Sequence, residues 1–169
     1  MQSEPTRLPV DADALCAAME ETFRGGGDFR FYPTGRSMLP MLRERGDYVI
    51  LKSPAVRPPR VTDVVLYRRK NGQLVLHRII GVRGDAFRMC GDGQSVPENG
   101  IENDQILGVL TAFCRAPKGN SHGAARPVPA NVPLYRAYVR VWIASRPFRR
   151  LYSALRRRIF RLFRAKKRP

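Results

Sequence analysis

The sequence predicts a mainly β protein: an antiparallel, barrel-like or sandwich-like β domain, preceded by a short helix and followed by a basic amphipathic helical tail. Between residues 29 and 116, six short apolar runs are separated by turns rich in Gly, Pro, Asn and Asp, with no helical period between them. The charge distribution separates a nearly neutral part from a basic one. Residues 1–104 carry 15 Lys and Arg against 14 Asp and Glu, whereas residues 105–169 carry 16 Lys and Arg and no acid. A chain of 169 residues can bury one core, so we expect one domain with appendages.

Residues 1–28 are predicted to form a short helix and a glycine hinge. Asp11 is a suitable N-cap, and Gly25–Gly27 would end the helix. The apolar residues between them lie on roughly one side of the helix: Leu15, Ala18, Met19 and Phe23. This spacing predicts an amphipathic helix.

The β domain, residues 29–116, is predicted from six segments rich in Val, Ile, Leu, Phe and Tyr: FRFY, DYVILK, VTDVVLYRR, QLVLHRIIGVR, AFRMC and QILGVLTAFC. The turn sequences between them include RERGD, KNGQ and GDGQSVPENG. KNGQ lies between two apolar runs and is a strong signal for a hairpin. Short strands without intervening helices indicate antiparallel pairing.

Residues 117–133 have the composition of a linker, and residues 134–169 form the predicted tail. Pro147 should divide the tail into two helices, because proline removes a backbone donor and clashes with the preceding turn. In the first of these helices, the residues predicted to lie on the buried side are Leu134, Tyr138 and Trp142.

The second part of the tail combines an apolar stripe with arginines on the remaining face. This composition is typical of a helix that lies in the headgroup plane of an anionic membrane. The residues predicted to bind the membrane are Phe148, Leu151, Leu155, Arg157, Ile159, Arg161 and Leu162. Two other interpretations stay open: the stripe packs on the protein's own β domain, or the arginines bind nucleic acid.

The sequence predicts a peripheral rather than a spanning relation to the membrane. No uncharged apolar run approaches the ~20 residues that a spanning helix needs. The N-terminus lacks the charged-then-apolar pattern of a signal peptide. Since basic segments favour the cytoplasmic leaflet, we expect a location at the cytoplasmic face.

Ser37, in the stretch TGRSMLPMLRERGD, lies between Gly35 and Pro40, a sequence that predicts a shaped turn presenting one hydroxyl. A hydroxyl is a weak nucleophile until a base removes its proton. His77, in QLVLHRII, is the only histidine in the predicted β domain, and its usual pKa of about 6.5 suits a general base. Activity that depends on such a base should rise through roughly pH 6–7. Ser37 and His77 are therefore the candidate nucleophile and base.

The ordered series GRSMLP, RGDYVIL, LHRIIGV and CGDG resembles the signal peptidase I family, whose β fold is shared with the self-cleaving LexA-like repressors. The resemblance covers roughly residues 29–110. It implies that Ser37 is the nucleophile and that Met38 and Pro40 shape its turn. Bacterial members place a lysine base where this chain has His77, and a histidine there marks the endoplasmic-reticulum and archaeal type. The implied activity is a serine endopeptidase that cuts a signal or leader segment of a protein or peptide after small residues.

The resemblance also implies a third catalytic group and an oxyanion hole. An acid a few residues beyond the Gly-Asp motif points to Glu98, while Asp92 is the other candidate and could instead fix its turn; both stay open. The backbone N–H of Ser37 is the expected first oxyanion donor. Signal peptidases usually carry another serine two residues before the nucleophile, where this chain has Gly35, so Gly35 marks the position of the second donor. The family's usual membrane-spanning anchor is missing from this sequence.

No metal or cofactor is expected, because Cys16, Cys90 and Cys114 form no CxxC pair and have no metal-ligand spacing. A Cys90–Cys114 disulfide stays open. The alternative function is a LexA-like, non-catalytic or self-cleaving regulatory module that binds membrane or nucleic acid through its basic tail. No Ala-Gly or Cys-Gly pair precedes Ser37 as a self-cleavage site, which disfavours the self-cleaving version. The sequence makes no prediction of the oligomeric state.

Overall fold

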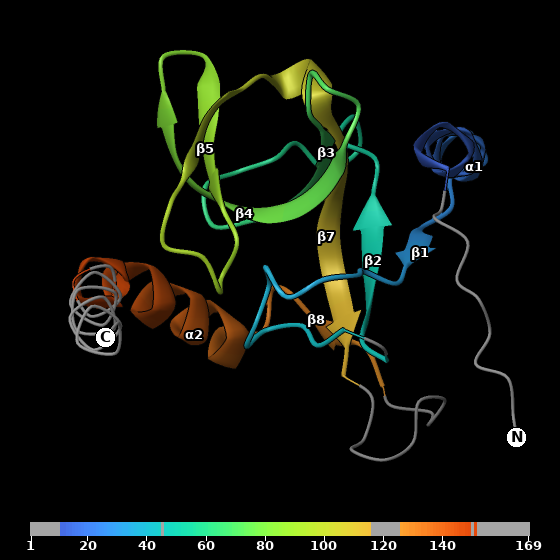
Figure 1. Ribbon diagram of the computed structural model, residues 1–169. Coiled ribbons are helices and arrows are strands. Elements are labelled where there is room, and N and C mark those ends of the chain that lie inside the picture. Colours follow the sequence, from blue (N-terminus) through green and yellow to red (C-terminus); the bar gives the residue numbers. More distant parts are fainter. Residues whose placement is uncertain (1–10, 45, 116–125, 150, 152–169) are drawn as a thin grey trace, which may run out of the picture.

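The protein is mainly antiparallel β, with eight strands in one open sheet and few helices (Figure 1). The computed structural model describes residues 11–44, 46–115, 126–149 and 151. The strands follow the order β1-β2-β7-β3-β4-β5-β6, and β8 pairs with β7. Every pair of neighbouring strands is antiparallel.

The six predicted strand segments are all confirmed, and the sheet has two further strands. The strands are β1 (Phe29–Phe31), β2 (Tyr48–Lys52), β3 (Val64–Arg68), β4 (Leu74–Arg83), β5 (Ala86–Cys90), β6 (Glu98–Ile101), β7 (Ile106–Cys114) and β8 (Val128–Pro129). A 3₁₀ turn, η1 (Asn103–Gln105), leads into β7. β6 lies where the sequence predicted only a turn, and β8 lies inside the predicted linker. Both are short, and they contain Asn and Gly (β6) or Pro (β8), which are rare in strands, so they form by pairing with a longer neighbouring strand rather than by their own propensity.

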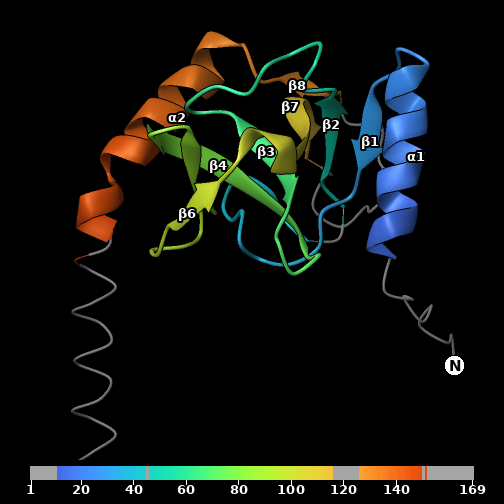
Figure 2. The same cartoon turned by 90° about the horizontal axis from the view of Figure 1, so that it is seen from above.

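Helix α1 (Ala12–Arg24) lies beside β1, at a distance from α2 (Figures 1 and 2). Its predicted caps are confirmed: the Asp11 carboxylate accepts from the Asp13 amide, and the Gly25 amide donates to Glu21. Met19 is buried in the core, and Phe23 packs against the same cluster. Ala18, which was expected on this side, is exposed.

Helix α2 (Pro133–Ala144) corrects the prediction for the first tail helix. Leu134 was expected on the buried side but is 83 % exposed, whereas Val139 is buried. The helix meets the sheet through Tyr135, whose ring lies 5.3 Å from that of Phe113. Tyr138 and Trp142, which were expected on the buried side, are half-buried, as is Tyr135. α2 ends at Ala144, before Pro147, and residues 146–149 are helical again.

The sheet is buried on both faces, which explains why β3 is buried over four consecutive residues. Val64 and Leu66 belong to one apolar cluster, and Val65 and Tyr67 to another. The same alternation on β4 puts Leu76 in the first cluster and Ile79 in the second. The side chains of successive residues on β3 and β4 therefore point to opposite faces of the sheet.

Two further findings concern the cysteines and the membrane. None of Cys16, Cys90 and Cys114 is in a disulfide bond, so the Cys90–Cys114 disulfide that the sequence left open is absent. Within the described ranges, no helix has the length and apolar character to cross a bilayer.

We expect Met19→Ala to lower the free energy of unfolding by about 2–4 kcal/mol, because it leaves a cavity between α1 and the sheet. Urea unfolding followed by fluorescence measures the change. The matched control is Glu20→Ala on the exposed side of the same helix, with an expected change of less than about 0.5 kcal/mol. Equal effects of the two substitutions would show that α1 is not part of the core.

Candidate active site

Ser37 lies in the loop between β1 and β2, and the loop is anchored by its own apolar residues. Met38, Met41 and Leu42 are buried in the core, and the Leu42 amide donates to the Met38 carbonyl at 3.0 Å. Gly35 has a φ of +86°, a backbone conformation that favours glycine. The turn therefore holds a half-buried Ser37 between a glycine bend and a fixed apolar anchor.

His77 lies on β4 and is 2 % exposed. In the antiparallel register it stands opposite Val65 on β3, which makes Tyr67 its diagonal neighbour on the same face. The His77 Nδ1 atom lies 3.2 Å from the Tyr67 hydroxyl oxygen. The imidazole is thus buried with one of its two nitrogens hydrogen-bonded.

The hydrogen bonds of Tyr67 determine which nitrogen of His77 carries the proton. The Tyr67 hydroxyl donates its only proton to Glu98 Oε2 at 2.8 Å. Its oxygen can then only accept from His77, so the His77 proton is on Nδ1. The Nε2 atom keeps its lone pair, which is the state a general base requires.

Arg69 fixes the outer end of this chain of hydrogen bonds. Its Nη2 donates to Glu98 Oε2 at 2.6 Å, and its Nε lies 2.8 Å from Oε1. Partial burial would raise the pKa of Glu98, but the hydrogen bonds from Arg69 and Tyr67 outweigh burial and lower it. Burial and the bond to Glu98 raise the pKa of Tyr67. Glu98 is therefore an anion at neutral pH and Tyr67 a neutral donor.

Burial lowers the pKa of His77 to about 4, although the charge of Glu98 acts in the opposite direction. The ring is therefore neutral over the whole physiological range. The sequence predicted that activity would rise through roughly pH 6–7, on the assumption of a histidine with an ordinary pKa. Because burial lowers the pKa of His77, we now expect that rise at a lower pH.

The turn Gly91–Asp92–Gly93 brings the serine loop and the histidine strand together. A side chain at Gly91 would collide with the Ser37 carbonyl and lie 3.1 Å from His77 Nε2. A side chain at Gly93 would lie 3.1 Å from the carbonyl oxygens of Arg36 and Leu39. The Gly93 amide donates to the Ser37 carbonyl at 2.8 Å. Both glycines are required by close backbone approach, and the turn packs directly between Ser37 and His77.

The two carboxylates considered as orienting groups occupy different places. Glu98 reaches His77 through Tyr67, while Asp92 pairs with Arg78 on the opposite face of β4 at 2.6 Å. Both members of the Arg78–Asp92 pair are buried. Burial opposes the charged form of Arg78, but the hydrogen bond and charge of Asp92 raise its pKa. Removing one partner of such a buried ion pair lowers the free energy of unfolding by about 3–5 kcal/mol. Asp92 therefore has a structural role, in which its carboxylate anchors the turn to Arg78.

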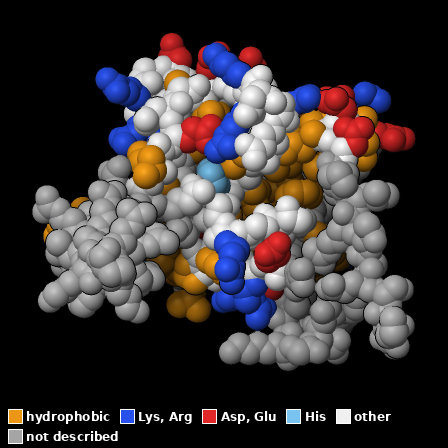
Figure 3. All heavy atoms as spheres, viewed as in Figure 1, with side chains coloured by type: hydrophobic (Ala, Val, Ile, Leu, Met, Phe, Trp, Pro, Cys, Tyr) orange, Lys and Arg blue, Asp and Glu red, His pale blue; other side chains and the backbone are white. Residues whose placement is uncertain are grey.

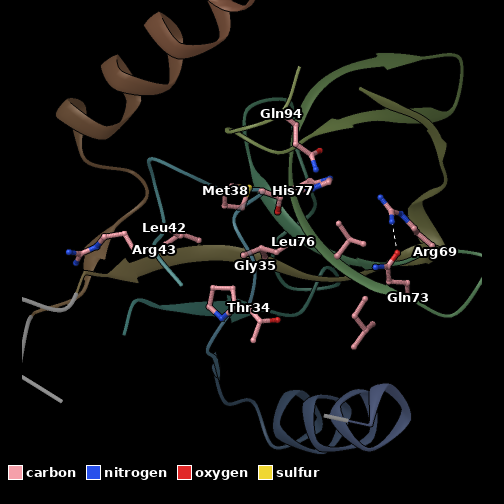
Figure 4. Close-up of a pocket in the computed structure, with 14 residues that line it drawn as sticks. Thr34, Gly35, Met38, Leu42, Arg43, Arg69, Gln73, Leu76, His77 and Gln94 are labelled. Atoms are coloured by element: carbon pink, nitrogen blue, oxygen red, sulfur yellow. Dashed lines mark hydrogen bonds between the residues drawn. The ribbon is translucent and has the colours of Figure 1, made fainter. Parts of the chain in front are cut away.

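Ser37 and His77 line the same cavity of about 250 Å³. Figure 4 shows its labelled residues, with Gly35, Thr34 and Met38 coming from the serine loop and Leu76 and His77 from β4. In the space-filling view a histidine side chain is visible at the centre of the face, beside hydrophobic side chains (Figure 3). No hydrogen bond of the Ser37 hydroxyl is found within the described part of the chain, and catalytic hydrogen bonds often tighten only when substrate binds.

One edge of β4 is open along this cavity. β4 pairs with β5 only from Arg78 onward, so residues 74–77 have no strand neighbour on that side among the described strands. Leu74, Val75 and Leu76 line the cavity at this edge. The edge offers backbone groups to an extended chain.

The structure adds residues that the sequence did not single out. Tyr67 and Arg69 connect Glu98 to His77 and to the sheet, and the only available signal was a tyrosine in the aliphatic run VVLYR. Gln94 also lines the cavity (Figure 4). Gly35, the position expected for a second oxyanion donor, also lines the cavity but carries no side-chain donor.

The predicted membrane-binding residues are only partly described. Phe148 and Leu151 are 75 % and 70 % exposed. The remaining predicted contacts lie outside the described residues: Leu155, Arg157, Ile159, Arg161 and Leu162.

We expect stability to fall as the pH drops from about 6.5 toward 4, because the pKa of His77 in the folded state lies below its unfolded value of about 6.5. Between these values the unfolded chain binds more protons, so the contribution of neutral His77 is full above pH 6.5 and is lost below it. Urea unfolding of wild type and His77→Gln at pH 7 and pH 5 measures the slope, which should be smaller in the variant. His122→Gln controls for loss of the other histidine. Equal slopes in wild type and His77→Gln would contradict the burial of a neutral ring.

The chain matches none of the protein-family models and none of the curated proteins with which it was compared.

Proposed function

We propose that this protein is a serine endopeptidase of the signal peptidase type, with Ser37 as nucleophile and His77 as general base. The observation that carries the proposal is that the two ring nitrogens of His77 lie in different surroundings. Its Nδ1 is held by Tyr67 and Glu98, while its Nε2 faces the Gly91 turn beside Ser37. A buried, neutral imidazole with one nitrogen fixed and the other next to a serine turn is the arrangement that activates a hydroxyl.

In the proposed reaction, His77 Nε2 takes the Ser37 proton as Oγ attacks the substrate carbonyl carbon. The imidazolium that forms is stabilised through its Nδ1–H bond to Tyr67 and by the Glu98 anion beyond it. Nε2 then gives its proton to the leaving amine, and the peptide C–N bond breaks to leave an ester on Ser37. Nε2 then takes a proton from water as the water oxygen attacks the acyl carbon. The bond from that carbon to Ser37 Oγ breaks, the acid product leaves, and Nε2 returns the proton to Oγ.

The backbone N–H of Ser37 and the segment at Gly35 would hold the oxyanion in this proposal. Gln94 is a further donor of the right type, since its side-chain amide carries N–H groups and the residue lines the same cavity as Ser37 and His77 (Figure 4). Of the two acids, Glu98 is the proposed orienting group because it is linked to His77 through Tyr67, while Asp92 is bound to Arg78.

The substrate in this proposal is an extended segment of a protein or peptide. The open edge of β4 at residues 74–77 would pair with its backbone, and the serine loop would face it from the other side. An open edge accommodates a chain that continues in both directions, which supports cleavage within a chain. That the substrate is a signal or leader segment, and that the sheet has the barrel-like fold of signal peptidases and LexA-like repressors, follows from the motif resemblance.

We also propose that the C-terminal helical region places the enzyme on an anionic membrane surface. The exposed side of α2 carries Leu134 and Val141, and Phe148 follows after the break at Ser145. These residues recur every seven positions, on the side away from the buried Val139. Residues 105–169 supply 16 basic residues and no acid. An apolar stripe flanked by arginines suits a lipid headgroup plane better than a nucleic acid, which needs no apolar stripe.

We expect Ser37→Ala and His77→Ala each to abolish cleavage, and the double variant to be no worse than either, because the two groups act as one unit. Cleavage is measured on a peptide library prepared from a proteome, with products identified by mass spectrometry. Glu20→Ala, on the exposed side of α1 and outside the cavity, is the control for a change that spares the dyad. Losses that multiply in the double variant, or full activity in Ser37→Ala, would contradict the proposal. No cleavage by the wild-type chain would leave the non-catalytic module as the better account.

We expect the full chain to bind vesicles of mixed neutral and anionic lipid, and to bind them less tightly at high salt as the exposed charges are screened. Val141→Asp together with Phe148→Asp should weaken binding by about tenfold or more, because both side chains are exposed on the proposed membrane face. Vesicle sedimentation measures the affinity. Ala144→Asp on the exposed side of α2 is a control for added charge alone. Tighter binding to nucleic acid than to anionic vesicles would contradict the membrane proposal.

A further inference from the structure

Helix α2 docks next to the reaction centre through Tyr135. The Tyr135 ring packs on Phe113 of β7, with 5.3 Å between ring centroids. Its hydroxyl lies 3.2 Å from Arg78 Nη1 and 3.6 Å from the Met41 sulfur. The helix therefore touches both the strand that carries His77 and the loop that carries Ser37.

Arg149, in the helical turn after α2, reaches the glycine turn directly. Its Nη1 donates to the Asp92 carbonyl at 3.0 Å, and its Nη2 donates to the Trp142 carbonyl at 2.7 Å. The guanidinium lies over the Trp142 ring, with 3.6 Å from its central carbon to the ring centroid. Trp142 in turn stacks on Tyr138, and Tyr138 stacks on Tyr135. The guanidinium is thus clamped between the glycine turn and a row of aromatic rings.

These contacts hold Asp92 by both its side chain and its backbone. Arg78 binds the carboxylate at 2.6 and 2.8 Å, and Arg149 binds the carbonyl. The next residue, Gly93, donates to the Ser37 carbonyl at 2.8 Å. An unbroken series of hydrogen bonds therefore runs from the C-terminal helical region through the turn to the proposed nucleophile.

We propose that the segment 133–149 positions the nucleophile: Arg149 and Tyr135 are positioning residues that fix the Gly91–Asp92–Gly93 turn and, through it, the Ser37 backbone. The inference rests on the proposed function for its catalytic consequence, but the mechanical link to the turn does not. The segment that fixes the turn then lies more than 50 positions beyond His77 in the chain. Without the docked helix, the sheet would still form, while the turn that sets the Ser37–His77 approach would lose one of its two anchors.

The test compares Arg149→Ala, Arg149→Lys and Tyr135→Phe with Arg140→Ala, an arginine on the exposed side of α2. The first readout is amide hydrogen exchange at Gly93, with Val109 in the buried strand β7 as internal reference. The second readout is the rate at which a fluorophosphonate labels Ser37, located by mass spectrometry. Tyr135→Phe removes only a hydroxyl and keeps the ring packing, so it tests the link even where Arg149→Ala folds poorly.

We expect Arg149→Ala to raise exchange at Gly93 by about tenfold or more while Val109 stays unchanged, because the opening is local. Labelling of Ser37 should fall by about tenfold to a hundredfold, as expected when a reacting group shifts by about 1 Å. Tyr135→Phe should show a smaller change of the same sign, Arg149→Lys a partial recovery, and Arg140→Ala none. Unchanged Gly93 exchange in Arg149→Ala and Tyr135→Phe, or equal increases at Gly93 and Val109, would overturn the inference. Failure of wild type to label at Ser37 would instead count against the proposed function, and the exchange data would still decide whether α2 fixes the turn.

Discussion

The burial of one imidazole is the constraint on which the rest of the site depends. His77 is 2 % exposed, in a sheet covered on both faces, where an unpaired polar ring would cost several kcal/mol. The cost is offset only if the ring stays neutral and its N–H finds an acceptor. Tyr67 is that acceptor because its hydroxyl donates its one proton to Glu98. Glu98 stays an anion because the Arg69 guanidinium donates hydrogen bonds to its carboxylate. Arg69 keeps Glu98 charged, Glu98 fixes the direction of the Tyr67 hydroxyl, and that direction decides which nitrogen of His77 carries the proton.

The alternation of side chains on β4 connects this series to the serine loop. His77 points to the face that holds Tyr67, and the adjacent Arg78 points to the face that holds Met41 and α2. One strand thus carries the proposed base and, one residue later, the cation that fixes the glycine turn under Ser37. Because a shift of register by one residue would exchange the two faces, the pairing of β3 with β4 sets both halves of the site at once.

Much of the fold could be predicted from local pattern, because alternating apolar runs and glycine turns act over short distances. The six strand segments and the caps of α1 fall in that class. β6, β8 and the buried face of α2 could not be predicted, since each depends on a partner distant in the sequence. Leu134 illustrates the limit: its spacing fits a buried stripe, but contact through Tyr135 turns the helix so that Leu134 is exposed.

The same distinction holds for the candidate site. Ser37 and His77 could be chosen from residue type and motif order, but nothing in the sequence shows that Tyr67 would lie between His77 and Glu98, because that contact depends on strand register. The sequence also could not decide between Asp92 and Glu98 as the orienting acid, because the buried ion pair of Asp92 with Arg78 exists only in the folded protein. The ordinary pKa assumed for His77 failed for the same reason, since burial is a property of the folded sheet.

The pH dependence of Ser37 labelling by a fluorophosphonate tests the central claim most directly, because it needs no knowledge of the substrate. The reagent forms a bond from Ser37 Oγ to phosphorus and releases fluoride, and the base must take the serine proton. With the pKa of His77 lowered to about 4, the rate at pH 5.5 should be close to that at pH 7.5, and His77→Gln should lose labelling at both. An ordinary exposed histidine would be about 90 % protonated at pH 5.5, so a rate about tenfold lower there would contradict the account. Labelling that is unaffected in His77→Gln, or that falls on another residue, would contradict it as well.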